Sequence, residues 1–296
     1  RKTLQEKDIM KYCVDKNAEA HITTIQNIKP GMIEREVENV FVSYVKNSLY
    51  YRECAYPPIA ASGKSSSMAH YMKNDEELKA GGLILFDMGV KLGGYSSDIT
   101  STVPISGKFT PKQKSIYNLV LCANRAVMKH AKCGVFWPTM HLLAEKVILT
   151  GLQKLGLISD QHSIEEMLKE RLGYVFMFHG LGHLIGLGTH DIGGYLSFTP
   201  PRSELPGLKQ LRTARYLTEG NVITVEPGCY FNSYILEKSF KDPKLGKYLN
   251  ETNIREYFDF GGVRIEDIIY ITKDGCENLS WKVPRKVEDI EKLMNA

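Results

Sequence analysis

Apolar residues near the start of the chain recur at the three- to four-residue spacing of amphipathic helices. One series is Ile22, Ile25 and Ile28, and the next is Val37, Val40, Phe41 and Tyr44. Lys29-Pro30-Gly31 lies between them, and a proline followed by glycine interrupts helices. The pattern predicts two helices that are broken at residues 29–31.

A second helix pair is predicted farther along the chain. Thr110-Pro111-Lys112-Gln113 has the form of a helix N-terminus, with a capping threonine, proline in the first turn and glutamine three residues later. Its buried face continues through Ile116, Leu119, Val120, Ala123 and Val127. Lys132-Cys133-Gly134 then interrupts before a helix from about Thr139. Both helix pairs therefore contain a break of the form Lys-x-Gly.

The apolar strands that follow each helix pair also match one another. Leu78–Gly89 aligns without gaps on Leu217–Gly228, and each segment ends an apolar strand in one carboxylate, Asp87 or Glu226. A second match joins two strands that open with a glycine pair, at Gly93-Gly94 and at Gly261-Gly262. Each of these strands carries an acid at the same place, Asp98 and Glu266.

Repetition alone thus predicts the architecture and the site. We expect one α+β domain over residues 1–296, built from two helix-helix-strand-strand units that a pseudo-two-fold axis relates. The turn-like stretch Val90–Tyr95 would let its flanking strands pair antiparallel. The four acids would then meet where the units meet. Buried carboxylates repel one another unless they share protons or bind cations, so divalent metal ions are the natural ligand.

A simpler interpretation exists for each acid taken singly. A strand aspartate is more often a charge on a solvated face or at a sheet edge. Asp87 and Glu226, however, lie in the apolar runs Phe86-Asp87-Met88 and Val225-Glu226-Pro227, where an unpaired charge would be costly. Four acids at repeat-related positions favour the metal site.

Histidines add candidate ligands in one part of the chain. His179-Gly180-Leu181-Gly182-His183 is a glycine-rich segment that could approach a metal closely, and His190-Asp191 follows. The other histidines considered have no acidic or glycine-rich context, and a structural role is expected for His21, His130, His141 and His162.

Composition excludes several classes of protein. The 296 residues are 43% hydrophobic and 24% charged, and the net charge of +4 is spread along the chain, without the basic stripe of a nucleic-acid binder. No apolar run reaches the length of a membrane span. Six cysteines without a CxxC pair predict buried free thiols in a reduced, cytoplasmic compartment.

The order Asp87, Asp98, His183, Glu226, Glu266 resembles the metal ligands of the metallopeptidase family that includes methionine aminopeptidase, aminopeptidase P and prolidase. This resemblance covers nearly the whole chain. It implies the pita-bread fold, a homodimer and two divalent ions bridged by Asp98 and Glu266. Asp87 would complete one ion's shell, and His183 and Glu226 the other's. Manganese is the first expectation, with cobalt or zinc as substitutes.

Within the family, several motifs resemble the prolidases. They are Phe178–His183, His190–Tyr195, Leu211–Arg215 and Gly261–Asp267. The resemblance implies a dipeptidase that hydrolyses Xaa-Pro dipeptides through a metal-bridging hydroxide, with no nucleic acid or membrane as partner. It also implies an additional N-terminal domain, which we expect this chain to lack.

The resemblance further assigns roles to individual residues. Glu226 would be the acid/base, His190 would stabilise the oxyanion, and His70 would contact the substrate from the other side. Arg212 would bind the carboxylate of the C-terminal proline, because a guanidinium fits a carboxylate bidentately. The other candidate substrate-binding residues are His179, Arg264, Tyr56 and Ile59. Arg212 could also be a solvated charge, and Tyr56 an ordinary core aromatic residue.

Two other functions remain open from the sequence. A Xaa-Pro aminopeptidase of the aminopeptidase P type would use the same five ligands on longer peptides. A non-catalytic pita-bread domain that binds protein partners would need no metal, and the intact ligand set argues against it.

Overall fold

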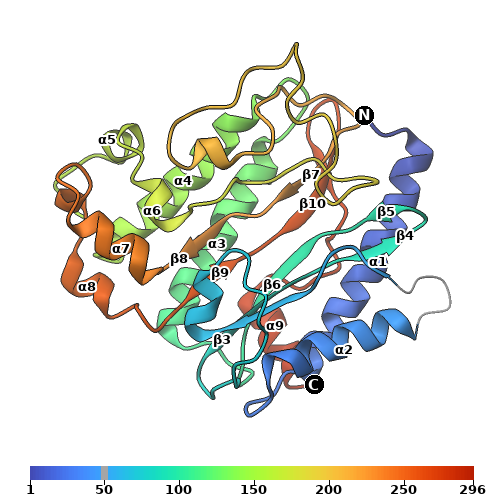
Figure 1. Ribbon diagram of the computed structural model, residues 1–296, viewed down its shortest axis with the longest axis horizontal. Coiled ribbons are helices and arrows are strands. Elements are labelled where there is room, and N and C mark those ends of the chain that lie inside the picture. The colour runs from blue at the N-terminus through green and yellow to red at the C-terminus, as the bar shows by residue number, and fades with distance from the viewer. Residues whose placement is uncertain (48–52) are drawn as a thin grey trace.

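Both predicted helix pairs are present in the computed structural model, which describes residues 1–47 and 53–296 (Figure 1). The first pair is α1 (Leu4–Asn27) and α2 (Glu34–Lys46), and the second is α3 (Pro111–His130) and α4 (Trp137–Lys154). At the start of α3, the Thr110 hydroxyl accepts from the Gln113 N–H and the Gln113 side chain accepts from the Thr110 N–H. The predicted capping box is confirmed. Helix α4 begins two residues before the predicted Thr139, with Pro138 in its first turn.

Short helices fill the connections. They are α5 (Ile164–Lys169), α6 (Gly173–Phe176), α7 (Ser233–Phe240), α8 (Glu251–Arg255), α9 (Val287–Met294) and the 3-10 turns η1 (Gly63–Ser67), η2 (Leu208–Gln210) and η3 (Gly246–Tyr248).

The strands pair antiparallel throughout. The first half contributes β1 (Glu53–Cys54), β2 (Ile59–Ser62), β3 (Leu83–Met88), β4 (Val90–Leu92), β5 (Tyr95–Ser96) and β6 (Ile99–Pro104). The second half contributes β7 (Val222–Val225), β8 (Gly228–Tyr230), β9 (Gly262–Arg264), β10 (Asp267–Ile271) and β11 (Cys276–Asn278). Their orders are β2-β3-β6, β11-β10-β7, β1-β4-β5 and β8-β9.

The predicted repeat is visible in these pairings. Strands β3 to β6 correspond in order to β7 to β10: β3 pairs with β6 as β7 pairs with β10, and β4 pairs with β5 as β8 pairs with β9. The register differs by two residues, since Asp87 faces Thr100 whereas Thr224, not Glu226, faces Ile268. A shift of two keeps every side chain on its own face of the sheet.

One connection differs clearly between the two halves. Gly93 and Gly94, with φ of 59° and 86°, form a two-residue turn between β4 and β5, as expected for a tight hairpin. The stretch Val90–Tyr95 is therefore a hairpin, and only its glycine pair is a turn, which corrects the prediction for this stretch. The equivalent connection between β8 and β9 contains α7, η3 and α8.

One face of the strands packs on the long helices and the other carries polar groups. Phe86 and Met88 of β3, and Ile223 and Val225 of β7, belong to the buried core that includes residues of α1 to α4. Because side chains alternate along a strand, Asp87 points to the other face. Figure 1 shows α3 behind the strands of the second half and α1 beside β4 and β5.

The cysteine prediction holds only in part. All six cysteines are free, but Cys122 and Cys133 are exposed and only Cys13 and Cys229 are buried, so the expected burial of all six is wrong.

Within the described residues, no helix is both long and apolar enough to cross a membrane.

Candidate active site

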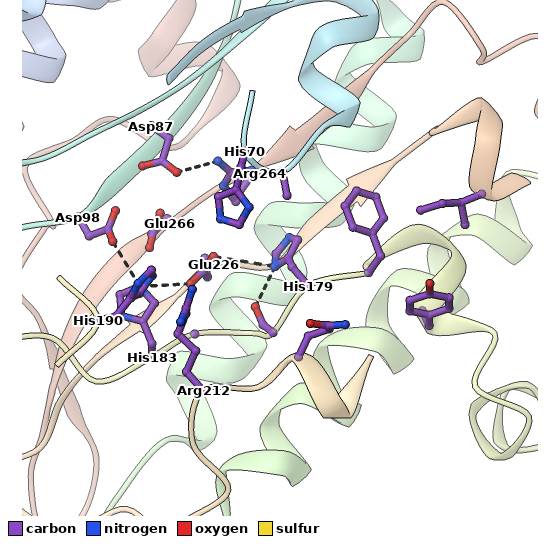
Figure 2. A pocket seen from close by; sticks show the side chains of 17 residues that line it. His70, Asp87, Asp98, His179, His183, His190, Arg212, Glu226, Arg264 and Glu266 are labelled. Carbon is purple, nitrogen blue, oxygen red and sulfur yellow. Dashed lines mark hydrogen bonds and ion pairs between the residues drawn. The ribbon is translucent and has the colours of Figure 1, made fainter. Parts of the chain in front are cut away.

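The repeat-related acids surround a cavity of about 430 Å³ (Figure 2). Asp87 comes from β3, Asp98 directly precedes β6, Glu226 directly follows β7, and Glu266 directly precedes β10. His183 joins them because its segment runs along β7, where Leu184 bridges to Ile223. The chain thus brings together all five residues that the sequence marks as candidate ligands.

Asp98, His183 and Glu266 form the tightest group. One ligand atom from each lies within 4.8 Å of the others, and all three residues are buried. The His183 Nδ1 lies 3.1 Å from the Leu184 carbonyl and can only donate to it, which leaves Nε2 facing Asp98 at 3.3 Å. An imidazole fixed in this way presents its free lone pair to a metal ion.

Asp87 and Glu226 lie around this group and also have protein partners. Asp87 accepts from the Tyr56 hydroxyl at 2.6 Å and from Arg264 Nη2 at 2.8 Å. Glu226 Oε1 accepts from the Thr224 hydroxyl at 3.2 Å and lies 3.6 Å from His183 Nε2. Both carboxylates are thereby aimed into the cavity.

Electrostatics shows that the cluster carries more negative charge than its surroundings balance. Burial first, and then Asp87, raises the pKa of Asp98, while burial raises the pKa of Glu226 to about 7. Burial and the neighbouring Asp98 raise the pKa of Glu266 well above its ordinary value. Burial disfavours the imidazolium of His183, but Asp98 and Glu226 outweigh burial and raise its pKa. Divalent cations would relieve this repulsion, and the oxygen-rich donor set with one imidazole fits them.

The remaining histidines of the predicted site also line the cavity. The His190 ring packs edge-on against His183, with centroids 4.5 Å apart, and burial lowers its pKa to about 4. His179 Nε2 lies 2.8 Å from the Tyr230 hydroxyl, and burial lowers the pKa of His179 to about 3. Both imidazoles are therefore neutral at pH 7. His70 reaches the cavity from the segment after η1.

Cationic side chains lie on two sides of the cluster. Arg264 is buried, and its nitrogens donate to Asp87, Tyr230 and the Thr100 hydroxyl, so its charge balances Asp87. Arg212 lines the cavity, and its side chain has no hydrogen bond or ion pair with any residue that the structure describes. In Figure 2 it points toward His183, His190 and Glu226. Arg215 instead donates to the Gly193 carbonyl at 3.0 Å.

Two predicted residues stand apart from the cavity lining. The Tyr56 hydroxyl lies 2.6 Å from Asp87 Oδ1 and 2.5 Å from Asp98 Oδ1, and the two carboxylates share its single proton. Ile59 is buried on β2 and pairs with Asp87 in the sheet, within a small cluster with Ala61 and Tyr71.

Sequence reasoning missed several residues that the structure brings to the site. The missed lining residues are Ala69, Tyr174, Gln210 and Ile235, while Phe178, Gly180 and Gly182 belong to the segment that the sequence had already marked. The missed supports include Thr100, which donates to Glu266 at 2.7 Å, and Arg285, which donates to the backbone carbonyls of Thr100 and Glu266. Thr100 lies two residues after Asp98, and only the strand register reveals that it faces Asp87.

The family model for metallopeptidase family M24 matches residues 8–273, which is most of the chain. The chain belongs to this family. This is a family of metallopeptidases, and its α+β pita-bread fold agrees with the predicted architecture.

Individual relatives fall into two groups by name. The chain is 42% identical to rat "Xaa-Pro dipeptidase" over 99% of its length and 60% of the relative's. It is 41% identical to a "Probable Xaa-Pro aminopeptidase pepP" of Botryotinia fuckeliana, over 100% of the chain and 63% of the relative. The chain thus spans about 60% of the length of the curated relatives it matches.

Solved structures of the same fold cover the chain almost completely. Aminopeptidase PepP of Pseudomonas aeruginosa superposes with a TM-score of 0.82 at 33% identity, covering 99% of this chain and 59% of that one. Escherichia coli aminopeptidase P with the inhibitor Pro-Leu gives a TM-score of 0.81 at 30% identity, again over 99% and 59%. These superpositions confirm the pita-bread fold.

Proposed function

We propose that the chain is the catalytic domain of a dipeptidase that hydrolyses the bond before a C-terminal proline. The observation that carries this proposal is the side chain of Arg212, a guanidinium without a protein partner among the described residues, in the same cavity as the carboxylate cluster. Arg212 is exposed, so its guanidinium is open to solvent and free to make a charge-assisted, bidentate contact with the free carboxylate of a dipeptide. The cavity, about 430 Å³, falls within the range of roughly 300–1,000 Å³ usual for small-molecule sites.

Two divalent ions would be held by Asp87, Asp98, His183, Glu226 and Glu266. When bound they supply a Lewis acid and an activated water. The carboxylate-rich set suits Mn²⁺, with Co²⁺ or Zn²⁺ as possible substitutes.

The protein's own groups would divide the remaining tasks. Glu226 would carry a proton to the proline nitrogen as the bond breaks. His190, neutral at pH 7, could donate its N–H to the scissile carbonyl oxygen as that oxygen gains charge. His70 and His179 would contact the substrate, while Arg264 and Tyr56 would act through Asp87, which both of them contact.

An aminopeptidase of the Xaa-Pro type is the second candidate. It is favoured by the similarity to aminopeptidase P structures and to the fungal relatives named for that activity. The two activities differ in the group on the C-terminal side of the proline. A dipeptidase requires a free carboxylate there, whereas an aminopeptidase accepts a longer peptide.

The deciding experiment assays metal-stripped protein on Gly-Pro and Gly-Pro-Ala, with and without Mn²⁺. We expect Mn²⁺-dependent cleavage of Gly-Pro alone and no cleavage by Glu226→Gln. Cleavage of Gly-Pro-Ala would assign an aminopeptidase. If the metal-loaded protein cleaves neither peptide, a binding role would be favoured.

Arg212→Gln tests the carboxylate contact itself. Losing a hydrogen-bonded charge contact of about 1.5–3 kcal/mol should raise KM for Gly-Pro roughly tenfold to a hundredfold. Lys209→Gln removes an exposed cation three residues away and should leave KM unchanged. Equal KM values for the two variants would contradict a role for Arg212.

We also propose a homodimer in the cytoplasm. Exposed apolar side chains on one long loop support an interface, namely Leu187, Ile192 and Phe198. Six free thiols support a reducing compartment. Light scattering of the purified protein would test the dimer.

A further inference from the structure

A second set of buried titratable side chains lies outside the carboxylate cluster. His141 and Glu145 are on α4, and Arg171 lies between α5 and α6. The side chains of His141 and Glu145 are fully buried, and Arg171 is 6% exposed. Arg171 Nη2 donates to Glu145 Oε1 at 2.6 Å, and His141 Nε2 lies 3.0 Å from the same oxygen. We call these three residues the α4 cluster.

The α4 cluster is linked directly to the wall of the cavity. Arg171 Nε donates to the Pro206 carbonyl at 2.9 Å, just before η2 and the segment that carries Gln210 and Arg212 to the cavity. On its other side, Arg171 leads into α6, whose Tyr174 also lines the cavity. One guanidinium therefore ties α4 to two segments that bound the site.

Packing around the α4 cluster leaves little room for these segments to shift. A Cβ added to Gly207 would lie 3.0 Å from Arg171 Nη2 and 3.1 Å from Glu145 Oε1. A Cβ added to Gly173 would lie 2.5 Å from Glu145 Cδ. Arg171 itself has φ of 65°, a left-handed conformation that residues with a side chain rarely adopt. Such strain persists where the surroundings over-determine a conformation, and it is concentrated at functional sites.

We propose that Glu145 and Arg171 are positioning residues that set the placement of Gln210 and Arg212, and through them the affinity for the carboxylate end of the substrate. This rests on the proposed function. A buried ion pair is a weak source of stability, because the desolvation of two charges offsets their attraction. The main effect of the ion pair is instead to fix the positions of the segments that it joins. Arginine holds the Pro206 carbonyl through Nε and Glu145 through Nη2, two nitrogens in one fixed plane, and the single nitrogen of lysine does not reproduce this geometry.

The same segment has a second support on its exposed side. Arg202 Nη1 donates to the Lys209 carbonyl at 2.9 Å, and the Tyr195 hydroxyl donates to the Leu211 carbonyl at 3.0 Å. These contacts hold the outer side of the segment, and Arg171 holds its inner end. Removing the inner contact should therefore loosen the segment without releasing it from the molecule.

Two variants test the proposal. Arg171→Lys keeps the charge but loses the fork, and the double variant Glu145→Met with Arg171→Met replaces the pair by apolar groups of similar length, a change that buried pairs often tolerate. Glu165→Gln is the matched control, because Glu165 forms an exposed ion pair with Lys146, the residue after Glu145. All are compared with wild type in the Mn²⁺-loaded state.

Amide hydrogen exchange over residues 205–213 is the first readout, because it needs no substrate. The N–H groups of Lys209, Gln210 and Leu211 are bonded within this turn. We expect their exchange to be about tenfold faster in Arg171→Lys and in the double variant, with β3 and β7 unchanged. The second readout is KM for Gly-Pro, which should rise about tenfold at nearly constant kcat, as expected for lost substrate binding. Glu165→Gln should match wild type in both.

The outcomes separate the two proposals. If wild type cleaves neither peptide, the proposed function fails, and the exchange of residues 205–213 still decides whether the α4 cluster holds the segment. Exchange and KM equal to those of Glu165→Gln would overturn the inference, and so would faster exchange with an unchanged KM. If the double variant exchanges fast throughout, it is unfolded, and Arg171→Lys decides.

Discussion

Gly182 is a position in the site where an added methyl group should have a large effect. A Cβ there would lie 2.0 Å from the backbone oxygen of Thr224 and 3.0 Å from its hydroxyl. The first contact is with a backbone atom and cannot be relieved by a side-chain rotation. Gly182→Ala must therefore move the His179–His183 segment away from β7.

The cost depends on the contacts that hold this segment. The Thr224 N–H donates to the His183 carbonyl and the Glu226 N–H donates to the Leu181 carbonyl, both at 2.9 Å, and Trp137 Nε1 donates to the Gly182 carbonyl at 3.3 Å. At about 1 kcal/mol for each hydrogen bond, losing two or three of them lowers the free energy of unfolding by about 2–3 kcal/mol. His183 moves with the segment, so metal affinity should fall as well.

Urea unfolding in the presence of a chelator measures the first effect, and calorimetric titration with Mn²⁺ measures the second. Gly188→Ala is the matched control in the same part of the chain. Its added Cβ would lie no closer than 3.4 Å to any neighbour, and its φ is outside the left-handed region. We expect it to stay within about 0.5 kcal/mol of wild type. If Gly182→Ala matches Gly188→Ala in both measurements, the close approach to β7 does not constrain the site.

Two further predictions concern charge. In chelator-treated protein, Glu266→Gln should raise Tm, because it removes one of several mutually repelling buried carboxylates. Adding Mn²⁺ should then raise the Tm of the variant less than it raises the Tm of wild type. A chelated variant that is less stable than chelated wild type would contradict this. His21 is fully buried between the Ser101 hydroxyl and the Met88 carbonyl, and burial lowers its pKa from 6.5 to about 3. The pKa of His21 is lower in the folded state than in the unfolded state. The contribution of neutral His21 to the free energy of unfolding is therefore complete above about pH 6.5 and is lost as pH falls toward 3. Between pH 5.5 and 4, wild type should therefore lose about 1.4 kcal/mol more per pH unit than His21→Gln, as urea unfolding at several pH values would show; parallel pH profiles would refute the assignment.

The sequence predicted the parts of the molecule that depend on local spacing. The helix breaks, the Thr110 cap and the correspondence of Asp87 with Glu226 and of Asp98 with Glu266 all depend on residues close together in the chain. The two-residue difference in register could not be predicted from residues close together in the chain, because it depends on how whole strands pair with each other.

Local context also misled in one case. The residues next to His141 and His162 in the chain indicate no acidic partner, yet each histidine lies four residues before a glutamate that it contacts, Glu145 and Glu166. The i,i+4 spacing was a signal that could have revealed both pairs. The contact of Arg171 with Glu145 could not be found in this way, since 26 residues separate them.

The placement of the candidate ligands has a consequence for how the molecule holds together. Asp87 and Asp98 come from the first repeat, and His183, Glu226 and Glu266 from the second, while Arg285 bonds to backbone carbonyls on both sides. Neither repeat alone presents a complete site. A bound ion would therefore act as a reversible cross-link across the pseudo-two-fold axis. Once the concentration of free metal exceeds the Kd of the ion, each tenfold rise in that concentration would increase the free energy needed to separate the two repeats by about 1.4 kcal/mol. Metal supply would then govern the lifetime of the folded protein as well as its activity.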